Sequence, residues 1–317
     1  MKVLVSGGTG LVGRYIAEEL LSAGYKVVIG GRNPPPPGLF SQPVSFVPLS
    51  LNPTENQSSA FDDAYFFVHA AFSHVAGKYR GGEGEDPQGF RRLNLDGSVK
   101  LFETARRAGI RRCIFLSSRA VYGDGIAGEE LTETAAPKPN TLYGEIKRDA
   151  EHALFSLSMP GFATASLRAT GVYGDLRPNK WDEMFSDHLS GKPVPSRAGT
   201  EVHGRDLGRA VRLLLETETG RIDGQAFNLS DILTDTCEIL GHLQSAMGCA
   251  HALPAPAERD AISVMDTAKI RALGWQGGGK ALLRQTIETL AKTMSPQVIL
   301  SASASSRPNQ APPVPRP

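Results

Sequence analysis

The 317-residue chain is poor in cysteine, and this excludes two classes of protein. Its three cysteines, Cys113, Cys237 and Cys249, are odd in number and match no zinc or redox spacing. A disulfide framework or a metal cluster would need paired or closely spaced cysteines. We therefore expect reduced packing residues and no metal.

The chain also lacks an excess of charge of one sign and a long apolar run. Its 34 basic and 33 acidic side chains leave a formal net charge of +1, which gives no electrostatic case for nucleic acid or an anionic membrane as a partner. No apolar run approaches a membrane span, and the start MKVLVSGGTG reaches glycine too early for a signal peptide. We expect a cytoplasmic protein with a small-molecule substrate. A homodimer is compatible with the sequence, which does not determine the oligomeric state.

What the chain does contain is an alternation of short apolar runs with longer amphipathic patterns. This alternation predicts an α/β fold, a Rossmann-type doubly wound parallel sheet covered by helices on both faces. We expect strands at residues 2–6, 26–30, 44–48, within 63–72, and at 111–118 and 162–168, and helices at 10–24, 91–109 and 142–157.

We expect parts of the chain beyond residue 174 to form a smaller C-terminal substrate lobe. We expect residues 1–174 to form the NAD(P)-binding domain, with about 201–230 returning to it. Residues 175–200 and 231–292 are expected to form the lobe. Residues 293–317 are too rich in Ser, Pro and Ala to fold, and this composition predicts a disordered tail.

A glycine-rich loop lies between the first strand and the first helix. In VLVSGGTGLVGRYIAEEL, Gly7, Gly10 and Gly13 follow the spacing G-x-x-G-x-x-G, with Leu11 and Val12 in the first helical turn. Glycines allow the tight turn and the close approach of a pyrophosphate, and the helix N-terminus offers it N–H groups. Because the motif follows a strand and opens an amphipathic helix, it predicts a dinucleotide site rather than a mere tight turn.

The end of the second strand bears on which dinucleotide binds. A carboxylate that holds the ribose 2′-hydroxyl is expected there, but Gly31 occupies that position and Arg32 follows it. Without an anion to repel it, a 2′-phosphate is favoured, and Arg32 could bind it through two hydrogen bonds. The alternative is that Arg32 lies over the adenine or in solvent. We predict NADP in preference to NAD.

Tyr143 and Lys147 lie four residues apart in LYGEIKRDAEHALFSL and therefore share one helix face. The preceding strand ends in Ser117 and Ser118, at the sheet edge where α/β proteins bind ligands. Hydride transfer at an oxygen-bearing carbon requires a proton to move on that oxygen. Free tyrosine titrates near pH ~10, and a nearby ammonium lowers that pKa. The combination predicts an acid–base site, which Y-x-x-x-K alone would not.

The ordered motifs resemble one known family. GGTGLVG, VHAAF, NLDGSVKLFETARRAGIRRCIFLSS, AVYG, YGEIKRDAE, LRATGVYG, VHGRDLGRAV and MDTAKIRALGW are similar to segments of the extended short-chain dehydrogenase/reductases, also labelled NAD-dependent epimerase/dehydratases. The resemblance covers about Met1 to Lys292. It implies a substrate-orienting Ser118, Tyr143 as general acid/base, and Lys147 as its pKa partner and a ligand of the nicotinamide ribose.

Other positions take their expected roles from the same resemblance. Asn94 falls where the family keeps an asparagine that supports the lysine through water; the alternative is a helix-surface amide. The VHAAF segment (His69, Ala70, Ala71) is expected beside the nicotinamide, together with Ser117. Arg119 and Trp181 are candidate substrate ligands, and Trp181 could instead only pack. His203 and Asp206 are expected to have structural roles rather than to bind substrate. For Arg168, an ion pair and a place in the site are both open.

Several positions depart from the family pattern, and they restrict the reactions and substrates that we expect. Arg119 and Ala120 stand where the dehydratases carry carboxylates. The chain therefore lacks the acid and the base that dehydration requires. Gly171 replaces an asparagine typical of the sugar-nucleotide epimerases, and Gly199 or Thr200 replaces an arginine. Both departures remove pyrophosphate contacts, which argues against an ordinary UDP-sugar substrate.

The predicted function is an NAD(P)-dependent oxidoreductase of carbohydrate metabolism that transfers hydride at a secondary alcohol or ketone of a sugar-like molecule. Two alternatives remain. One is a nucleotide-sugar epimerase, such as a 4-epimerase, that retains NAD. The other is a non-catalytic NAD(P)-binding sensor, against which the presence of Tyr143 and Lys147 argues.

Overall fold

Seven parallel strands form the main sheet of the computed structural model, which describes residues 1–74, 82–125 and 128–294. Their order is β3-β2-β1-β4-β5-β6-β9, so the chain winds outward in both directions from β1. This sheet confirms the predicted α/β doubly wound fold. The strands are β1 (Lys2–Ser6), β2 (Lys26–Gly31), β3 (Ser45–Pro48), β4 (Phe66–His69), β5 (Arg112–Ser118), β6 (Ala163–Ala169) and β9 (Gln225–Leu229).

The chain divides into two compact units. Residues 260–277, which we expected in the smaller lobe, lie in the first unit because Ile270 and Trp275 belong to its apolar core. Most of the tail that we expected to be disordered lies outside the described residues. The first unit comprises Met1–Val172, Thr200–Ile232 and Asp260–Gly277, and the second comprises Tyr173–Gly199, Leu233–Arg259 and the chain from Gly278.

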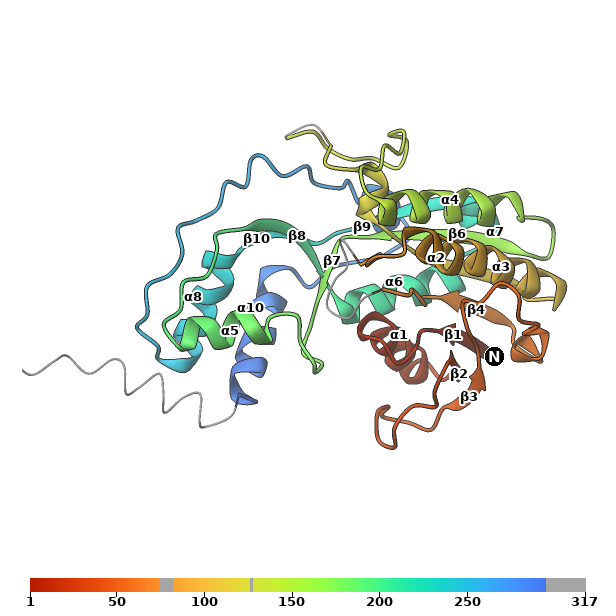
Figure 1. The fold of residues 1–317 in the computed structure, drawn as a ribbon, viewed down its shortest axis with the longest axis horizontal. Coiled ribbons are helices and arrows are strands. Elements are labelled where there is room, and N and C mark those ends of the chain that lie inside the picture. The colour runs from red at the N-terminus through yellow and green to blue at the C-terminus, as the bar shows by residue number, and fades with distance from the viewer. Residues whose placement is uncertain (75–81, 126–127, 295–317) are drawn as a thin grey trace, which may run out of the picture. The chain divides into compact units, whose positions relative to one another are not determined.

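Side chains of the main sheet alternate between two apolar layers, as the period of a strand requires. On one face Val3 and Val5 pack with α1 (Leu11–Ser22) and α6 (Gly204–Glu216). On the other face Leu4 packs with α3 (Gly97–Arg107) and α4 (Leu142–Ser156). These two helices lie side by side (Figure 1). Each buried Val or Leu contributes about 1.5–3 kcal/mol, so the loops at the carboxyl edge rest on a rigid base.

The first predicted helix ends as expected in the structure, whereas the second begins earlier than expected. Helix α1 ends where predicted, and Gly24, at φ +80°, donates its N–H to the carbonyl of Leu21 at 2.9 Å. The helix expected over 91–109 begins earlier, with α2 (Pro87–Arg91), where the Asp86 carboxylate accepts from Gly89 N at 2.8 Å. A π-helical turn at Arg92–Asp96 then separates α2 from α3. Such turns are frequent at functional sites.

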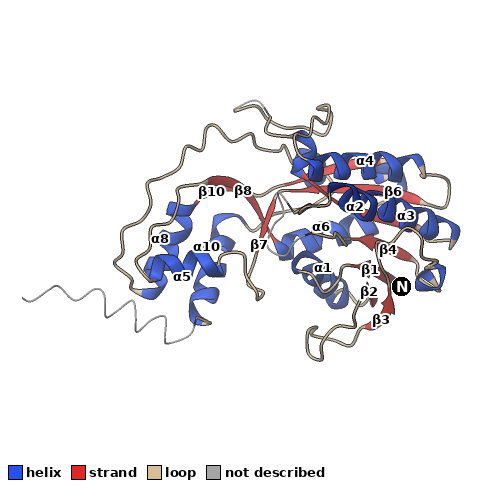
Figure 2. Cartoon of the chain, in the orientation of Figure 1, coloured by secondary structure: helices blue, strands red, loops and turns tan. Residues whose placement is uncertain are grey.

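The second unit is built mainly from helices, with α8 packed against α5 and α10 (Figure 2). A smaller sheet has the order β10-β8-β7. Within the described ranges no helix has the length and apolar character needed to cross a membrane. The remaining elements are η1 (Ser58–Phe61), η3 (Arg119–Tyr122), β7 (Gly171–Tyr173), α5 (Asp182–Leu189), β8 (Ala198–His203), α7 (Thr219–Ile222), β10 (Ile232–Asp235), α8 (Thr236–Met247), α9 (Ala268–Arg271) and α10 (Gly279–Lys292).

Candidate active site

The glycine-rich loop follows β1 and lies directly against the end of β4. Gly7 has φ +68°, and a Cβ there would lie 2.7 Å from the Cα and 2.8 Å from the N of Ala71. A Cβ on Gly13 would lie 2.7 Å from the Cα of Gly8. Both positions therefore require glycine, one for the conformation of the loop and both for its close packing.

Helix α1 begins immediately after this loop and presents its N-terminus there. Gly10 is the N-cap residue and provides no side-chain cap, and the first turn, which holds Leu11, Val12 and Gly13, has no acidic residue. The amides of a first helical turn have no acceptor within the helix, and the helix dipole places partial positive charge beside them. This end of α1 fits a dinucleotide diphosphate without any change of side chain.

The end of β2 has room for the carboxylate that it lacks. A Cβ on Gly31 would meet no atom closer than Asn33 O, at 3.8 Å. The absence of an acid there is therefore not a steric requirement of the fold. Arg32, the next residue, is exposed.

A buried chain of hydrogen bonds starts at Ser6, beside the glycine loop. The Ser6 hydroxyl lies 2.7 Å from His69 Nδ1, and His69 Nε2 lies 2.9 Å from the hydroxyl of Ser98. Ser98 donates onward to the carbonyl of Asn94 at 2.5 Å. Since Ser98 gives its proton to Asn94, it accepts from His69, which therefore carries its hydrogen on Nε2 and accepts at Nδ1 from Ser6.

This arrangement keeps His69 neutral. Burial, and next the charge of Lys147, lowers the pKa of His69 to about 3. The side chain is fully buried, so His69 faces the interior and the backbone of the following residues, Ala70 and Ala71, faces the glycine loop. Ala71 N donates to Ser6 Oγ at 3.4 Å, which holds this backbone beside the glycine loop.

Asn94 lies in the π-helical turn and is buried, so it is not a helix-surface amide. Its Oδ1 accepts from Ser73 N at 2.6 Å, and its Nδ2 donates to Ser73 O at 2.8 Å and to Phe90 O at 3.0 Å. The amide thus holds both backbone groups of Ser73. It fixes the segment that leaves β4.

Ser117 and Ser118 end β5 at the same edge of the sheet. Ser118 is half-buried, and its hydroxyl accepts from Ala120 N at 3.2 Å at the start of η3. Ser117 is 6% exposed, and its hydroxyl is without a hydrogen-bond partner among the described residues. A buried hydroxyl of this kind is able to accept or donate a bond to a ligand.

Helix α4 brings Tyr143 to this place. Thr141 caps the helix by accepting from Gly144 N at 3.1 Å, and Glu145 lies in the first turn, where a negative charge is favourable. A Cβ on Gly144 would lie 3.1 Å from the carbonyl carbon of Ala120, so the start of α4 packs on the backbone that follows Ser118. The glycine beside Tyr143 permits this approach.

Lys147 points from α4 into the interior and is only 4% exposed. Its Nζ donates to Leu116 O at 2.6 Å and lies 5.8 Å from the centroid of the Tyr143 ring. The Nζ is also 4.6 Å from the ring centroids of Phe72 and Phe115. Burial lowers the pKa of Lys147 to about 7, while the carboxylate of Glu151 acts in the opposite direction.

The candidate substrate ligands are differently placed. Arg119 donates to Ser263 O at 3.0 Å, which ties its guanidinium to the segment after residue 260. Trp181 belongs to the second unit, is 6% exposed, and stacks on Tyr173 with ring centroids 5.4 Å apart. Packing therefore accounts for Trp181.

A buried polar network that we did not predict lies behind Lys147. The carboxylate of Glu151, one turn further along α4, pairs with Arg168 at 2.7 Å and accepts from Ser166 at 2.7 Å. Arg168 in turn donates to the hydroxyl of Tyr122 at 2.8 Å, and that hydroxyl donates to Asn228 at 2.7 Å. The spacing of Lys147 and Glu151 is a helical i, i+4 pair, and this signal could have identified the network. Arg168 is thereby an ion-pair residue.

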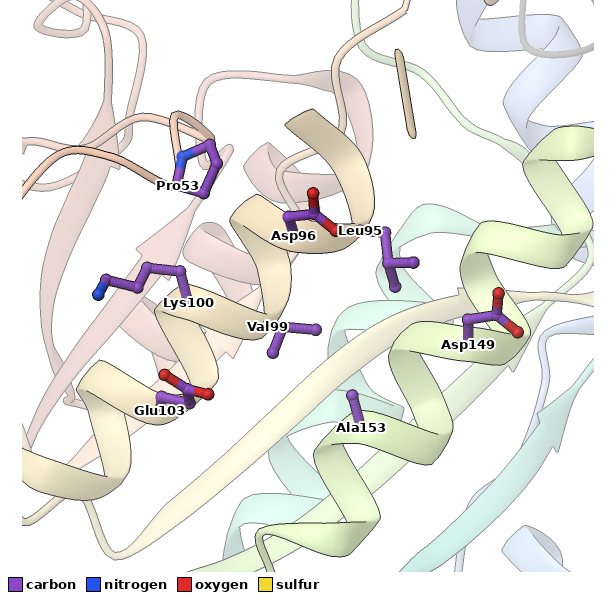
Figure 3. Close-up of a pocket in the computed structure, with 8 residues that line it drawn as sticks. All are labelled: Pro53, Leu95, Asp96, Val99, Lys100, Glu103, Asp149 and Ala153. Carbon is purple, nitrogen blue, oxygen red and sulfur yellow. The ribbon is translucent and has the colours of Figure 1, made fainter. Parts of the chain in front are cut away.

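A separate pocket of about 400 Å³ lies between α3 and α4 (Figure 3). It contains none of the predicted site residues. Its lining residues are Pro53, Leu95, Asp96, Val99, Lys100, Glu103, Asp149 and Ala153.

The sequence matches one family model, described as "NAD dependent epimerase/dehydratase family", over residues 3–230. It is 31% identical over 279 residues to UDP-glucose 4-epimerase of Streptomyces lividans, which covers 76% of this chain and 82% of that protein. It is 26% identical over 246 residues to 3 beta-hydroxysteroid dehydrogenase/Delta 5-->4-isomerase of Mycobacterium tuberculosis, covering 73% of this chain and 65% of that protein.

The fold is also similar to that of solved structures. UDP-glucose 4-epimerase of Thermus thermophilus in complex with NAD matches with a TM-score of 0.74 at 26% identity, over 93% of this chain and 100% of that one. The residues that match the family model include the glycine loop, β4, β5 and α4 described above. The chain therefore belongs to the NAD dependent epimerase/dehydratase family of enzymes, the extended short-chain dehydrogenase/reductases.

Proposed function

We propose that this protein is an NAD(P)-dependent oxidoreductase that transfers hydride at a secondary alcohol or ketone carbon of a sugar-like small molecule. Ser118 would orient the reacting oxygen, Tyr143 would move its proton, and Lys147 would stabilise the tyrosine in its phenolate form. The amides of Gly10 to Gly13 would hold the dinucleotide diphosphate, and bound nicotinamide would supply or accept the hydride.

The position of Lys147 supports this proposal most strongly. Its Nζ binds the carbonyl of Leu116, two residues before Ser118, and lies over the ring of Tyr143. In the reducing direction Tyr143 gives its hydroxyl proton to the substrate oxygen and becomes a phenolate. A buried ammonium close to that phenolate lowers the free energy of the charged state.

Replacing Tyr143 by Phe tests the assignment. We expect turnover to fall by at least about 100-fold, the usual contribution of a positioned acid or base, while the Kd for the dinucleotide changes less than about threefold. Turnover can be screened by nicotinamide absorbance on a panel of carbonyl compounds and sugars, and affinity by fluorescence titration. Near-normal turnover in the variant would contradict the role of Tyr143.

We further propose that NADP binds in preference to NAD. Gly31 offers no carboxylate to a 2′-hydroxyl, and the exposed guanidinium of Arg32 is next to it. Because Gly31 has room for a side chain, Gly31→Asp should reverse the preference by repelling the 2′-phosphate. Fluorescence titration of both cofactors should show at least about tenfold tighter NADP binding in the parent chain. Tenfold tighter NAD binding would overturn this preference.

The substrate proposal is supported by Glu201. A Cβ on Gly171 would lie 2.7 to 2.9 Å from the carboxylate atoms of Glu201, so this acid occupies the place of a side chain there. Gly171 is two residues beyond Ala169, which pairs in register with Ser118. A carboxylate at this edge repels a diphosphate and accepts hydrogen bonds from hydroxyl groups, which favours an uncharged polyol or sugar over a nucleotide sugar.

A nucleotide-sugar epimerase is the second candidate, favoured by the 31% identity to the Streptomyces lividans UDP-glucose 4-epimerase. An epimerase oxidises and re-reduces one carbon, so it produces no net change in cofactor oxidation state. Purified protein that carries bound NAD and interconverts UDP-sugars without net redox would establish this candidate. Release of reduced or oxidised cofactor in proportion to product would exclude it.

A further inference from the structure

The ring of Phe72 contacts both members of the predicted acid–base pair. It meets the Tyr143 ring edge-to-face, with centroids 5.0 Å apart and planes at 79°, and its centroid lies 4.6 Å from Lys147 Nζ. Phe72 belongs to neither β4 nor α4. It lies in the segment that leaves β4, three residues after His69.

Aromatic rings are a large part of the surroundings of the Lys147 ammonium. Its Nζ has a hydrogen bond to Leu116 O at 2.6 Å and lies 4.6 Å from two ring centroids, those of Phe72 and Phe115. Both distances are within the roughly 6 Å over which a ring face attracts a cation. Since Lys147 is 4% exposed, these faces take the place of water around the charge.

The backbone beside Phe72 is held on both sides. Asn94 binds the N–H and the carbonyl of Ser73 at 2.6 and 2.8 Å, and Ala71 N donates to Ser6 Oγ at 3.4 Å. Phe90, from α2, meets the Phe72 ring edge-to-face at 5.5 Å. Asn94 therefore reaches Tyr143 and Lys147 through Ser73 and the Phe72 ring.

We propose that Phe72 is a positioning residue for the reaction, whose single ring fixes the orientation of Tyr143 and stabilises the ammonium of Lys147, and that Asn94 acts on the pair through it. This inference rests on the proposed function. It also explains why a phenylalanine, which carries no reactive group, lies between the glycine loop and the acid–base pair.

The titratable groups around Lys147 determine the sign of the expected effect. Glu151 raises the pKa of Lys147 from one turn away on α4, Tyr143 faces it from the same helix, and His69 on β4 remains neutral. Removing the Phe72 ring leaves the charge of Glu151 and the neutral state of His69 as they are, and it takes away attraction for the cation. The pKa of Lys147, about 7 in the parent protein, should therefore fall further.

Phe72→Leu tests the proposal in the full-length chain. With 13Cε-labelled lysine, and Lys147→Met for assignment, NMR should show the midpoint of Lys147 lowered by about half a unit or more. The kcat should fall about tenfold, and the alkaline limb of its pH profile should move the same way, with KM little changed. Phe72→Tyr, which keeps the ring, should restore most of both readouts.

The matched control is Phe155→Leu, which removes a half-buried ring near the other end of α4 and should leave both readouts unchanged. If Phe72→Leu does not fold, Phe72→Met provides the same test with a flexible side chain. An unchanged Lys147 midpoint, or a normal kcat, overturns the role of Phe72. If Tyr143→Phe is fully active, the proposed function fails instead, and the Lys147 titration still reports on Phe72.

Discussion

His69 and Lys147 are buried neighbours at the same edge of the sheet, yet the protein treats their charges in opposite ways. His69 has a hydrogen-bond partner on each ring nitrogen and a pKa of about 3, so it is neutral throughout the physiological range. Lys147 has one hydrogen bond and contacts two ring faces. Its pKa of about 7 means that it gains or loses its proton near neutral pH.

We propose that this difference separates a structural role of the buried His69 from a reactive role of the buried Lys147. A group whose two nitrogens are both satisfied in neutral form holds the glycine loop, β4 and the π-helical turn together at any ordinary pH. A group with incomplete hydrogen bonding and a nearby carboxylate, Glu151, can gain or lose a proton as its surroundings change. Three substitutions at this edge test the comparison, in decreasing order of expected effect.

Gly13→Ala should have the largest effect, because its Cβ would collide with the backbone of the glycine loop. We expect the Kd for NAD(P) to rise by at least about 100-fold, which corresponds to about 2.7 kcal/mol. Fluorescence titration would measure the loss. Gly199→Ala is the matched control, since nothing lies within 4 Å of its Cβ and its backbone is not left-handed. Equal affinities in the two variants would show that the loop does not bind the dinucleotide.

Lys147→Met should change the pH dependence of stability. In the folded parent protein Lys147 titrates at about 7, below the usual value of 10.5, so between these pH values the unfolded chain binds a proton that the folded chain does not. The unfolding free energy of the parent protein should therefore rise with pH over that window, relative to the variant. Urea unfolding at several pH values measures the difference. A parallel pH dependence would mean that Lys147 has an ordinary pKa.

Ser98→Ala should have the smallest effect, because it removes only one hydrogen-bond acceptor, the hydroxyl that pairs with the neutral His69. It leaves the Nε2–H of His69 buried without a partner, at a cost of about 1–3 kcal/mol in unfolding free energy. Ser22→Ala, which removes an exposed hydroxyl bonded to Glu19 O, should cost less than about 0.5 kcal/mol. Equal unfolding free energies for the two variants would show that the His69 chain is not structural.

The sequence predicted the sheet well where strands are long and buried. The expected strands 111–118 and 162–168 correspond to β5 and β6 within one residue, because apolar runs bounded by turn residues have few other solutions. It missed β9, whose five residues include polar Gln225 and Asn228, and Asn228 is explained only by its bonds to Tyr122 and to Leu131 O. A strand of only five residues at the edge of a sheet carries little periodicity.

The sequence predicted an acid–base site of Ser118, Tyr143 and Lys147, because strand order and helix spacing place these residues at one edge of the sheet. Phe72 and Phe115 were not predicted, since the attraction of a ring for a cation depends on distances between segments far apart in the chain. The interruption of the 91–109 helix was missed for the same reason. Asn94 lies in the interrupting π-helical turn, and its side chain forms hydrogen bonds to the backbone of Ser73 in a distant segment.

The order of strands in the main sheet has a consequence for engineering. Strand β2, which carries Gly31 and precedes Arg32, is on one side of β1, whereas β4 and β5 are on the other. Substitutions at the proposed adenosine end of the cofactor site therefore touch neither the segment after His69 nor the residues that we propose for proton transfer. We therefore expect that cofactor preference and the proposed chemistry can be altered independently, through residues on opposite sides of β1.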